Sequence, residues 1–278
     1  MIPADRQDEK APDTAEGTIF ITGGAGFVGR HILAQLGERP LRVLMRDTRQ
    51  SSGIGGPNVE VVEGDVARPE TLRGVMDGAR AVIHLVAIIA EDGQTTFDRV
   101  IRQGTINVVA EAKRAGVERF LHMSALGTRN DPRFGYFHAK WQAEQAVEQS
   151  GIPWTIFRPS VIFGAGDEFI TTLAKLVKLA PIIPVVGSGL SKFQPVAVDD
   201  VATAFVRALD DPLAAGQVYE LGGGKTYTYE EMLDVIARRL GTSKPKIHIP
   251  TGLMKQVLKI SKPLPKALRP PVTTEQLK

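Results

Sequence analysis

Short apolar runs alternate with stretches of helical periodicity through the first 160 residues of the chain. The apolar runs predict strands at residues 18–22, 41–45, 59–63, 81–86, 120–123 and 154–157. Apolar residues at intervals of three and four predict helices at residues 27–36, 69–76, 95–115 and 136–149. Strands that alternate with helices form parallel sheets covered by helices. The pattern therefore predicts an α/β fold with a Rossmann-like, doubly wound parallel sheet.

The alternation breaks after residue 160, where the sequence predicts a small C-terminal lobe. Predicted helices at 168–179, 201–209 and 229–240 are mixed there with predicted strands at 193–198 and 218–221. We interpret 17–160 as a dinucleotide-binding core, and 161–278 as a mixed lobe that contributes late strands to the core. Residues 1–16 are polar and have no apolar segment, which is typical of a disordered leader and not of a signal peptide.

A glycine-rich turn lies between the first predicted strand and the first predicted helix, in the sequence TGGAGFVG at residues 22–29. In such a turn Gly23 permits the tight bend, Gly26 lets the backbone approach a pyrophosphate, and Gly29 lets helix and strand pack closely. The helix opens at Phe27 and Val28, so its free N–H groups and positive dipole end face the phosphates. This order of strand, turn and helix predicts dinucleotide binding.

Tyr136 and Lys140 are four residues apart at the start of a predicted helix, so both project from one face. A nearby ammonium favours the phenolate, which predicts a lowered pKa for Tyr136 and a role as general acid or base. Ser124 follows the predicted strand 120–123, at the sheet edge where ligands bind, and its hydroxyl is expected to contact a substrate oxygen. Taken singly, each residue also fits a structural role, as an exposed helix pair or a backbone contact.

Together these residues resemble the short-chain dehydrogenase/reductase superfamily, in its extended and atypical, epimerase-like branch. The resemblance covers roughly residues 18–240. It implies that the serine and tyrosine act on a substrate hydroxyl or carbonyl and that the lysine also binds the nicotinamide ribose. It further implies that Asn107 completes the catalytic set and that Asp65 contacts the adenine. The residues alone leave Asn107 as a helix-surface side chain and Asp65 as a helix cap or turn residue.

Two further segments, RPSVIFG at 158–164 and KFQPVAVDDVA at 192–202, are similar to one branch of that superfamily. This branch contains the nucleotide-binding accessory subunit of respiratory complex I and its bacterial relatives. The resemblance implies cofactor contacts at Val66, Ala87 and Arg158. It also implies, for the mitochondrial members, a structural NADPH. This chain differs from a protein whose nucleotide is purely structural, because Ser124, Tyr136 and Lys140 are all present.

The residue that closes the second strand distinguishes NADP from NAD. An arginine there pairs with a 2′-phosphate, whereas a carboxylate accepts hydrogen bonds from the ribose hydroxyls. Arg46 stands at this position and Arg30 follows the glycine turn, which favours NADP(H). If the second strand closes one residue later, Asp47 takes this position, so binding of NAD(H) stays open as an alternative.

The charge distribution concerns partners and location. From residue 244 the chain carries eight lysines and arginines against one acid, with apolar residues at helical spacing between 253 and 260. Such a basic amphipathic helix lies on an anionic membrane, docks on a partner or packs on its own domain. The basic tail has no interleaved aromatics, so we expect no nucleic-acid partner. The absence of cysteine fits a reducing compartment, either the cytoplasm or the mitochondrial matrix, with a peripheral membrane contact.

Several titratable residues are predicted to be structural. His84 lies in an apolar strand and is interpreted as a buried imidazole with its hydrogen bonds satisfied. Asp199 and Asp200 precede a predicted helix and are interpreted as caps. The five histidines show no metal-ligand spacing, so we predict no metal site.

The first hypothesis for function is an NADP(H)-dependent oxidoreductase that acts on a small molecule through Ser124, Tyr136 and Lys140. The alternative is a structural NADPH-binding accessory or assembly subunit of a membrane complex such as complex I. A sugar-nucleotide epimerase or dehydratase is a third reading. Apolar residues of the lobe favour a hydrophobic substrate and equally fit a lobe core: Phe163, Phe169, Ile170, Ile182, Ile183 and Val185. A homodimer would use the predicted helices 95–115 and 136–149.

Overall fold

Seven parallel strands form the central sheet of the computed structural model, which describes residues 17–50, 53–250 and 252. Their order is β3–β2–β1–β4–β5–β6–β11. The strands are β1 (Thr18–Thr22), β2 (Leu41–Met45), β3 (Val59–Glu63), β4 (Ala79–His84), β5 (Arg119–Met123), β6 (Trp154–Pro159) and β11 (Gln217–Leu221). The strand order reverses between β1 and β4, which is where Rossmann-like sheets bind their ligands. The predicted Rossmann-like fold is confirmed, and β1, β2 and β3 match their predicted bounds.

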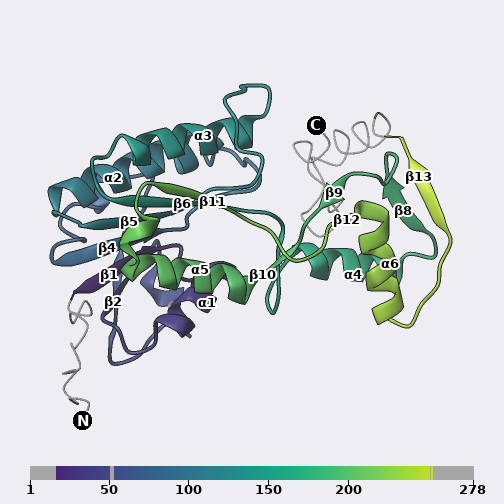
Figure 1. The fold of residues 1–278 in the computed structure, drawn as a ribbon, viewed down its shortest axis with the longest axis horizontal. Helices are drawn as coiled ribbons and strands as arrows, with labels where there is room; N and C mark the ends of the chain where they lie inside the picture. The colour runs from purple at the N-terminus through teal and green to yellow at the C-terminus, as the bar shows by residue number, and fades with distance from the viewer. Residues whose placement is uncertain (1–16, 51–52, 251, 253–278) are drawn as a thin grey trace, which may run out of the picture.

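Two pairs of helices cover the two faces of this sheet (Figure 1). The pair α1 (Phe27–Leu36) and α5 (Val198–Asp210) packs on the side chains of Ile19 and Ile21. The pair α2 (Gly104–Arg114) and α3 (Gly135–Glu148) packs on the opposite face, which includes Phe20. Alternate residues of β1 therefore enter different cores, as the two-residue period of a strand requires.

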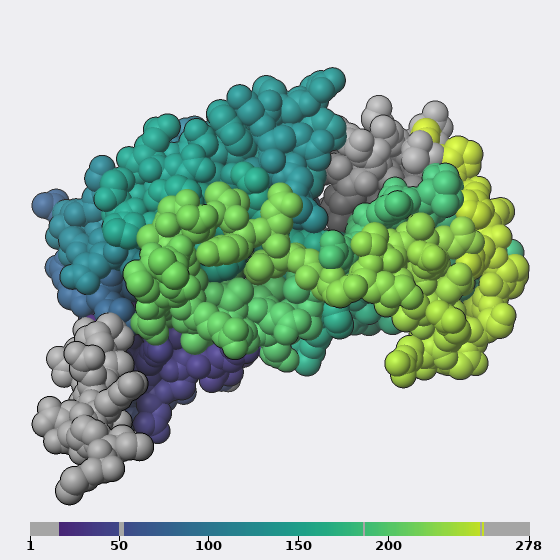
Figure 2. All heavy atoms as spheres, viewed as in Figure 1, coloured from purple at the N-terminus to yellow at the C-terminus, as the bar shows by residue number. Residues whose placement is uncertain are grey.

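A smaller second lobe stands beside the sheet (Figures 1 and 2). Its helices α4 (Phe169–Leu179) and α6 (Tyr229–Arg239) share a core with short paired strands. In the lobe, β8 (Ile183–Val186) pairs with β13 (Lys246–Ile249), and β9 (Lys192–Phe193) pairs with β12 (Tyr227–Thr228). A third pair, β7 (Ile162–Phe163) with β10 (Val196–Ala197), lies next to the core. The lobe thus combines two stretches of chain, one before α5 and one after β11.

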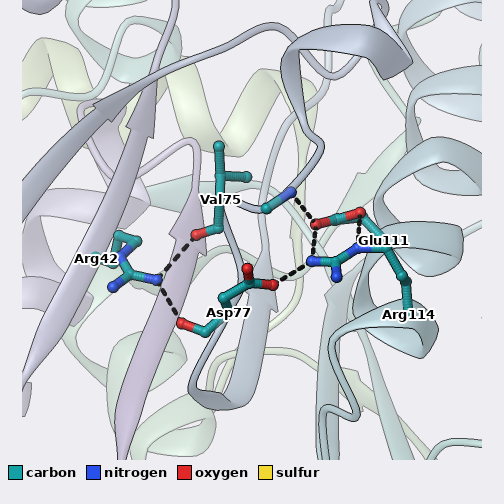
Figure 3. Close-up of polar contacts among 6 residues, drawn as sticks. Arg42, Val75, Asp77, Glu111 and Arg114 are labelled. Atoms are coloured by element: carbon teal, nitrogen blue, oxygen red, sulfur yellow. Dashed lines mark hydrogen bonds and ion pairs between the residues drawn. The ribbon is translucent and has the colours of Figure 1, made fainter.

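The predicted helix at 69–76 is wrong. Only a 3₁₀ turn, Pro69–Thr71, forms there, and Gly74 and Gly78 have positive φ angles of 82° and 75° that an α-helix does not accept. Figure 3 shows the polar network that holds this segment. Arg42 donates to the carbonyls of Val75 (3.1 Å) and Asp77 (2.8 Å).

The same network fastens the segment to α2. Arg114 donates to Asp77 and forms a forked ion pair with Glu111, and the Glu111 carboxylate accepts the Gly74 N–H at 2.7 Å (Figure 3). Long-range side-chain contacts therefore replace the backbone hydrogen bonds of the predicted helix.

Two other predictions need correction at helix starts. The predicted helix at 95–115 begins as a π-helical segment, Asp98–Gln103, and becomes α-helical only in α2. Asp199 and Asp200 lie within the first turn of α5 and do not cap it, because the helix begins at Val198. Carboxylates in a first turn still interact favourably with the helix dipole.

The predicted leader (1–16) and most of the basic tail, residues 251 and 253–278, lie outside the described residues. Among the described residues, no helix is long and apolar enough to cross a membrane. Contact of the tail with a membrane or a partner remains a prediction, as does the predicted location.

Two imidazoles are buried side by side between the sheet and the α2–α3 layer. His84 contacts the hydroxyls of Thr22 (2.6 Å) and Thr105 (3.0 Å), which confirms the predicted satisfied imidazole. His122 stacks on His84 with ring centroids 5.4 Å apart, and its ring nitrogens have no hydrogen-bond partner among the described residues. Burial, together with the charge of Lys140, lowers the pKa of His84 to about 3 and that of His122 well below its usual value.

These neutral histidines predict loss of stability in acid. Below about pH 6.5 the unfolded chain binds protons that the folded chain excludes, so the free energy of unfolding falls as the pH drops toward 3. We expect His84 alone to cost about 2 kcal/mol at pH 5 relative to pH 7. Urea unfolding at the two pH values measures this loss. His122→Leu removes an imidazole without breaking a hydrogen bond and should reduce the acid loss, and an equal loss in both proteins would contradict the assignment.

Candidate functional site

The glycine turn places the start of α1 against the carboxyl end of β1. Gly23 has a positive φ of 77°, and a Cβ there would lie 3.2 Å from the backbone of Leu85. A Cβ on Gly29 would overlap the Gly23 carbonyl oxygen and come within 2.6 Å of the Gly24 Cα. These positions accept only glycine without a shift of the backbone.

The start of α1 is built to receive an anion. Gly26 precedes the helix in an extended conformation, and no side chain caps the helix. The N–H groups of Phe27 and Val28 are among the first-turn donors that have no intrahelical partner. Uncapped N–H groups and the positive end of the helix dipole bind phosphate, so this end of α1 suits the pyrophosphate of a dinucleotide.

Arginines surround the end of β2, where the adenosine ribose of a dinucleotide would lie. Arg46 is exposed and forms no hydrogen bond or ion pair within the described part of the chain. Arg30 donates to the Ala25 carbonyl at 3.0 Å and lies beside Gly53. A pocket of about 400 Å³ opens here, lined by Arg46, Asp47, Thr48, Arg49 and Glu63.

Arg49 was missed by sequence reasoning. Its Nε and Nη2 donate to the two carboxylate oxygens of Asp47, at 2.9 and 3.2 Å, and its backbone N–H also donates to Asp47. Asp47 is therefore held by an arginine two residues later. A basic residue in the first turn after β2 was the available signal.

The next loop carries the predicted adenine contact. Asp65 accepts a hydrogen bond from the Ala67 N–H at 2.9 Å, which shapes the turn after β3. Asn107 donates to the Val66 carbonyl at 2.8 Å and accepts a hydrogen bond from Gln103 at 3.0 Å. These bonds hold the loop at Val66, and the catalytic role of Asn107 stays a prediction.

The predicted catalytic serine and lysine meet at the end of β5. Ser124 is 3% exposed, and its Oγ lies 3.1 Å from the Thr128 Oγ1. Because Thr128 donates its own proton to the Ala125 carbonyl, Ser124 is the donor in this pair. Lys140 is 1% exposed and donates to the Met123 carbonyl at 2.7 Å, next to Ser124.

Tyr136 lies one helical turn before Lys140, in an apolar setting. Its ring makes edge contacts with Phe97 and Phe137, at centroid distances of 5.7 and 5.2 Å, and the predicted cofactor contact Ala87 packs in the same cluster. No hydrogen bond reaches the Tyr136 hydroxyl from the rest of the described chain.

Burial moves the pKa values of this pair in opposite directions. It raises the pKa of Tyr136 to about 12 and lowers the pKa of Lys140 to about 8. The predicted lowering of the Tyr136 pKa is therefore wrong for the protein alone, because loss of solvent around the phenol raises its pKa. At neutral pH, Tyr136 is a proton donor beside a charged lysine.

Arg158 has a different environment from the one predicted. It extends from β6 to α3, where the Glu144 carboxylate accepts from its Nε at 2.9 Å and its Nη2 at 2.6 Å. Glu144 is fully buried. The pair fastens α3 to the sheet, and the cofactor contact at Arg158 stays a prediction.

The start of α1 also touches the entrance to the second lobe. The Phe27 ring lies against Gly164 and Gly166, which follow β7. His31 contacts Asp199 at 2.7 Å and the Ala165 carbonyl at 3.3 Å. Nucleotide-binding and lobe-forming segments are thus in direct contact.

The apolar residues of the lobe divide into two groups. Ile183 and Val185 are buried, and Phe169 and Ile170 pack against them, so these four form the lobe core. Other large apolar side chains are exposed after strands β4, β5 and β7 and before β8: Ile89 (68% exposed), Leu126 (39%), Phe163 (40%) and Ile182 (46%). No group of three histidine, aspartate or glutamate side chains in the described residues is arranged to hold a metal ion.

Comparison with known proteins identifies the family of this chain. A family model described as NAD(P)H-binding matches residues 23–212. The chain belongs to the NAD(P)H-binding family. A ceramide reductase from Caulobacter vibrioides is 33% identical over 241 residues, which are 85% of this chain and 74% of the relative.

Two further matches extend the comparison. The mitochondrial NADH dehydrogenase [ubiquinone] 1 alpha subcomplex subunit 9 of Arabidopsis thaliana is 31% identical over 79% of this chain, which spans 56% of that relative's length. A dTDP-glucose 4,6-dehydratase from Streptomyces venezuelae, solved with NAD, has a TM-score of 0.72 at 22% identity over 84% of each chain and shares the fold. The predicted relationship to the complex I subunit is confirmed, and the likeness to epimerase-like proteins is one of fold. The relative that is named a reductase supports an enzyme.

The close approach at Gly29 can be tested directly. We expect Gly29→Ala to raise the Kd for NADPH at least tenfold, roughly 1.4 kcal/mol, because the added Cβ pushes α1 away from the turn. Fluorescence titration with NADPH measures the change. Gly224→Ala is the matched control, since nothing lies within 4 Å of its added Cβ. Unaltered binding in Gly29→Ala would show that the turn does not form the nucleotide site.

Proposed function

We propose that this protein is an NADP(H)-dependent oxidoreductase that interconverts a carbonyl and a hydroxyl group on a hydrophobic small molecule. The observation that carries the proposal is the partly buried Tyr136, one helical turn from a buried lysine that donates to the Met123 carbonyl beside Ser124. These groups supply a proton, a positive charge and a hydrogen-bond donor at one sheet edge.

The chemistry follows from these positions. NADPH, when bound, supplies the hydride. Ser124 turns its hydroxyl from Thr128 to the substrate oxygen and orients the carbonyl. Tyr136 donates its proton to the same oxygen as the alcohol forms. The Lys140 ammonium, fixed by the Met123 carbonyl, then stabilises the phenolate that remains.

The preference for NADP(H) rests on the arginines at the end of β2. Arg46 and Arg30 offer guanidinium groups there, and a guanidinium binds a phosphate through paired charge-assisted hydrogen bonds. Asp47, the residue that would select NAD, is paired with Arg49. The local charge balance therefore favours the 2′-phosphate of NADP.

A hydrophobic substrate is supported by the exposed apolar side chains near the catalytic edge. Ile89 and Leu126 follow β4 and β5, at the carboxyl edge where Ser124 lies, and Phe163 ends β7. Exposed apolar residues that gather at a site favour an apolar ligand. The similarity to a ceramide reductase supports the same class, a carbonyl on a lipid-like molecule.

One observation favours a second function. The 31% identity to a subunit of mitochondrial NADH dehydrogenase supports a structural nucleotide in a membrane complex. Mass spectrometry of nucleotide released from extensively dialysed protein separates the two functions. An exchangeable NADPH supports turnover, and one nucleotide per chain that resists exchange supports the accessory role. Epimerase chemistry has weaker support, because the solved neighbour shows only the fold.

Tyr136→Phe tests the proton donor. We expect kcat/KM for NADPH-dependent reduction of hydrophobic ketones to fall by roughly 100-fold or more, because the phenol proton is lost. NADPH affinity should stay within about twofold, since the ring and its packing remain. Tyr219→Phe, in the edge strand β11, is the matched control. Full turnover by Tyr136→Phe would overturn the catalytic assignment.

Arg46→Ala tests the nucleotide preference. We expect the Kd for NADPH to rise tenfold or more and the Kd for NADH to change little, because a hydrogen bond to a charged group contributes about 1.5–3 kcal/mol. Isothermal titration with both nucleotides measures the ratio. Arg239→Ala, on the exposed end of α6, serves as the control. Equal losses for both nucleotides would contradict a 2′-phosphate contact at Arg46.

A further inference from the structure

One face of α3 carries three functional groups at intervals of four residues. Tyr136, Lys140 and Glu144 lie at successive turns of the helix and therefore point to the same side. The tyrosine lies at the sheet edge, the lysine reaches the end of β5, and the glutamate is the deepest, with no exposure. A fully buried carboxylate in this series needs a physical explanation, because burying a charge is costly unless it is compensated.

The lysine is the first part of that explanation. Its ammonium is buried, and a buried ammonium tends to lose its proton. The carbonyl of Met123 supplies one hydrogen bond but no charge. The nearest groups on the strands below are His122 on β5 and His84 on β4, which are neutral. Glu144 is the carboxylate whose charge opposes the effect of burial and raises the pKa of Lys140.

The second part is Arg158. Its guanidinium donates to both oxygens of Glu144, which gives the buried carboxylate a charged partner in the interior. Arg158 lies opposite Glu220 in the register of β6 and β11, with 3.9 Å between its Nη1 and the Glu220 Oε1. Glu220 is exposed to solvent. Charges of alternating sign thus run from Lys140 through Glu144 and Arg158 to the edge of the sheet.

We propose that Glu144 is a positioning residue of the catalytic site. Its buried carboxylate, held by the Arg158 fork, lies one helical turn from Lys140 and supplies the charge opposite to the lysine ammonium. The proposal rests on the proposed function for its catalytic meaning, since Tyr136 needs a charged lysine to stabilise its phenolate. The salt bridge between α3 and β6 then has an electrostatic purpose beyond packing. In the described part of the chain, the titratable groups that bear on Lys140 are Tyr136 and Glu144 on α3, His122 on β5 and His84 on β4, with Arg158 on β6 behind Glu144.

The test measures the protonation of Lys140 without turnover. Full-length protein labelled with ¹³C at the lysine Cε is titrated by NMR, and Lys140→Arg identifies the signal. Wild type should titrate near pH 8. Glu144→Gln should move the midpoint down by one unit or more, a tenfold loss of proton affinity. Glu144→Asp retains the charge and should restore most of the shift. Glu148→Gln, one helical turn further on α3, should leave the midpoint unchanged.

A double substitution is the control for misfolding caused by an unpaired Arg158. Glu144→Gln leaves Arg158 without its partner, so Glu144→Gln/Arg158→Gln, which removes both charges, is titrated as well. Its midpoint should also fall, because the carboxylate is absent. An unmoved Lys140 midpoint in both proteins, or a Glu144→Asp protein that behaves as Glu144→Gln, would overturn the proposal.

The proposed function and this inference fail in different ways. With a reducible ketone, the alkaline limb of the kcat/KM profile should move to lower pH in Glu144→Gln, because Lys140 loses its proton earlier. Absence of turnover in wild type together with a shifted Lys140 midpoint would refute the oxidoreductase and retain the electrostatic role of Glu144. Suppose instead that wild type turns substrate over, and that wild type and Glu144→Gln have the same kcat/KM profile and the same Lys140 midpoint. This result would refute the role of Glu144 and leave the oxidoreductase intact.

Discussion

The rest of this structure depends on the close backbone contact between α1 and the turn after β1. Gly29 has room for only a hydrogen atom against Gly23 and Gly24, and Gly23 in turn lies against the chain that leaves β4. This contact fixes the start of α1 above the point where the strand order reverses. The phosphate donors, the arginines after β2 and the catalytic edge at β5 are all positioned relative to that one helix end.

Loss of solvent then determines the chemistry of the catalytic edge. The apolar cluster that packs α3 against the segment before α2 leaves Tyr136 partly buried, and Lys140 is 1% exposed. Burial disfavours the charged form of each group, so it keeps the phenol neutral and weakens the hold of the lysine on its proton. A site of this kind needs an internal source of charge, and the carboxylate of Glu144 is the group in place to provide it.

The sequence was sufficient where local chemistry decides the structure. Alternation of apolar runs and helical periods predicts the sheet, and the strands β1 to β3 follow their predicted bounds because their residues are apolar and flanked by turns. The order of strand, glycine turn and helix is predicted correctly, and the structure brings the predicted Ser124 and Lys140 together at the end of β5. Prediction failed where contacts with residues far away in the sequence determine the local structure. The segment around Gly74 resembles a helix in its apolar spacing, but Arg42 and Glu111 take its backbone groups. Asn107 and Arg158 are engaged by partners about 41 and 14 residues away in sequence, and spacing gives no sign of such partners.

The second lobe has a consequence for the order of folding. Its core joins α4 to α6, and between them the chain returns to the sheet to form α5 and β11. Closing the contact between α4 and α6 while that intervening stretch is unfolded would carry the entropic cost of a long loop. Once β11 is paired with β6, the two ends of the stretch are already near each other and the cost is much smaller. We therefore expect the sheet to assemble first and the lobe to condense on it, so that a fully formed substrate side exists only on a molecule whose nucleotide side is complete.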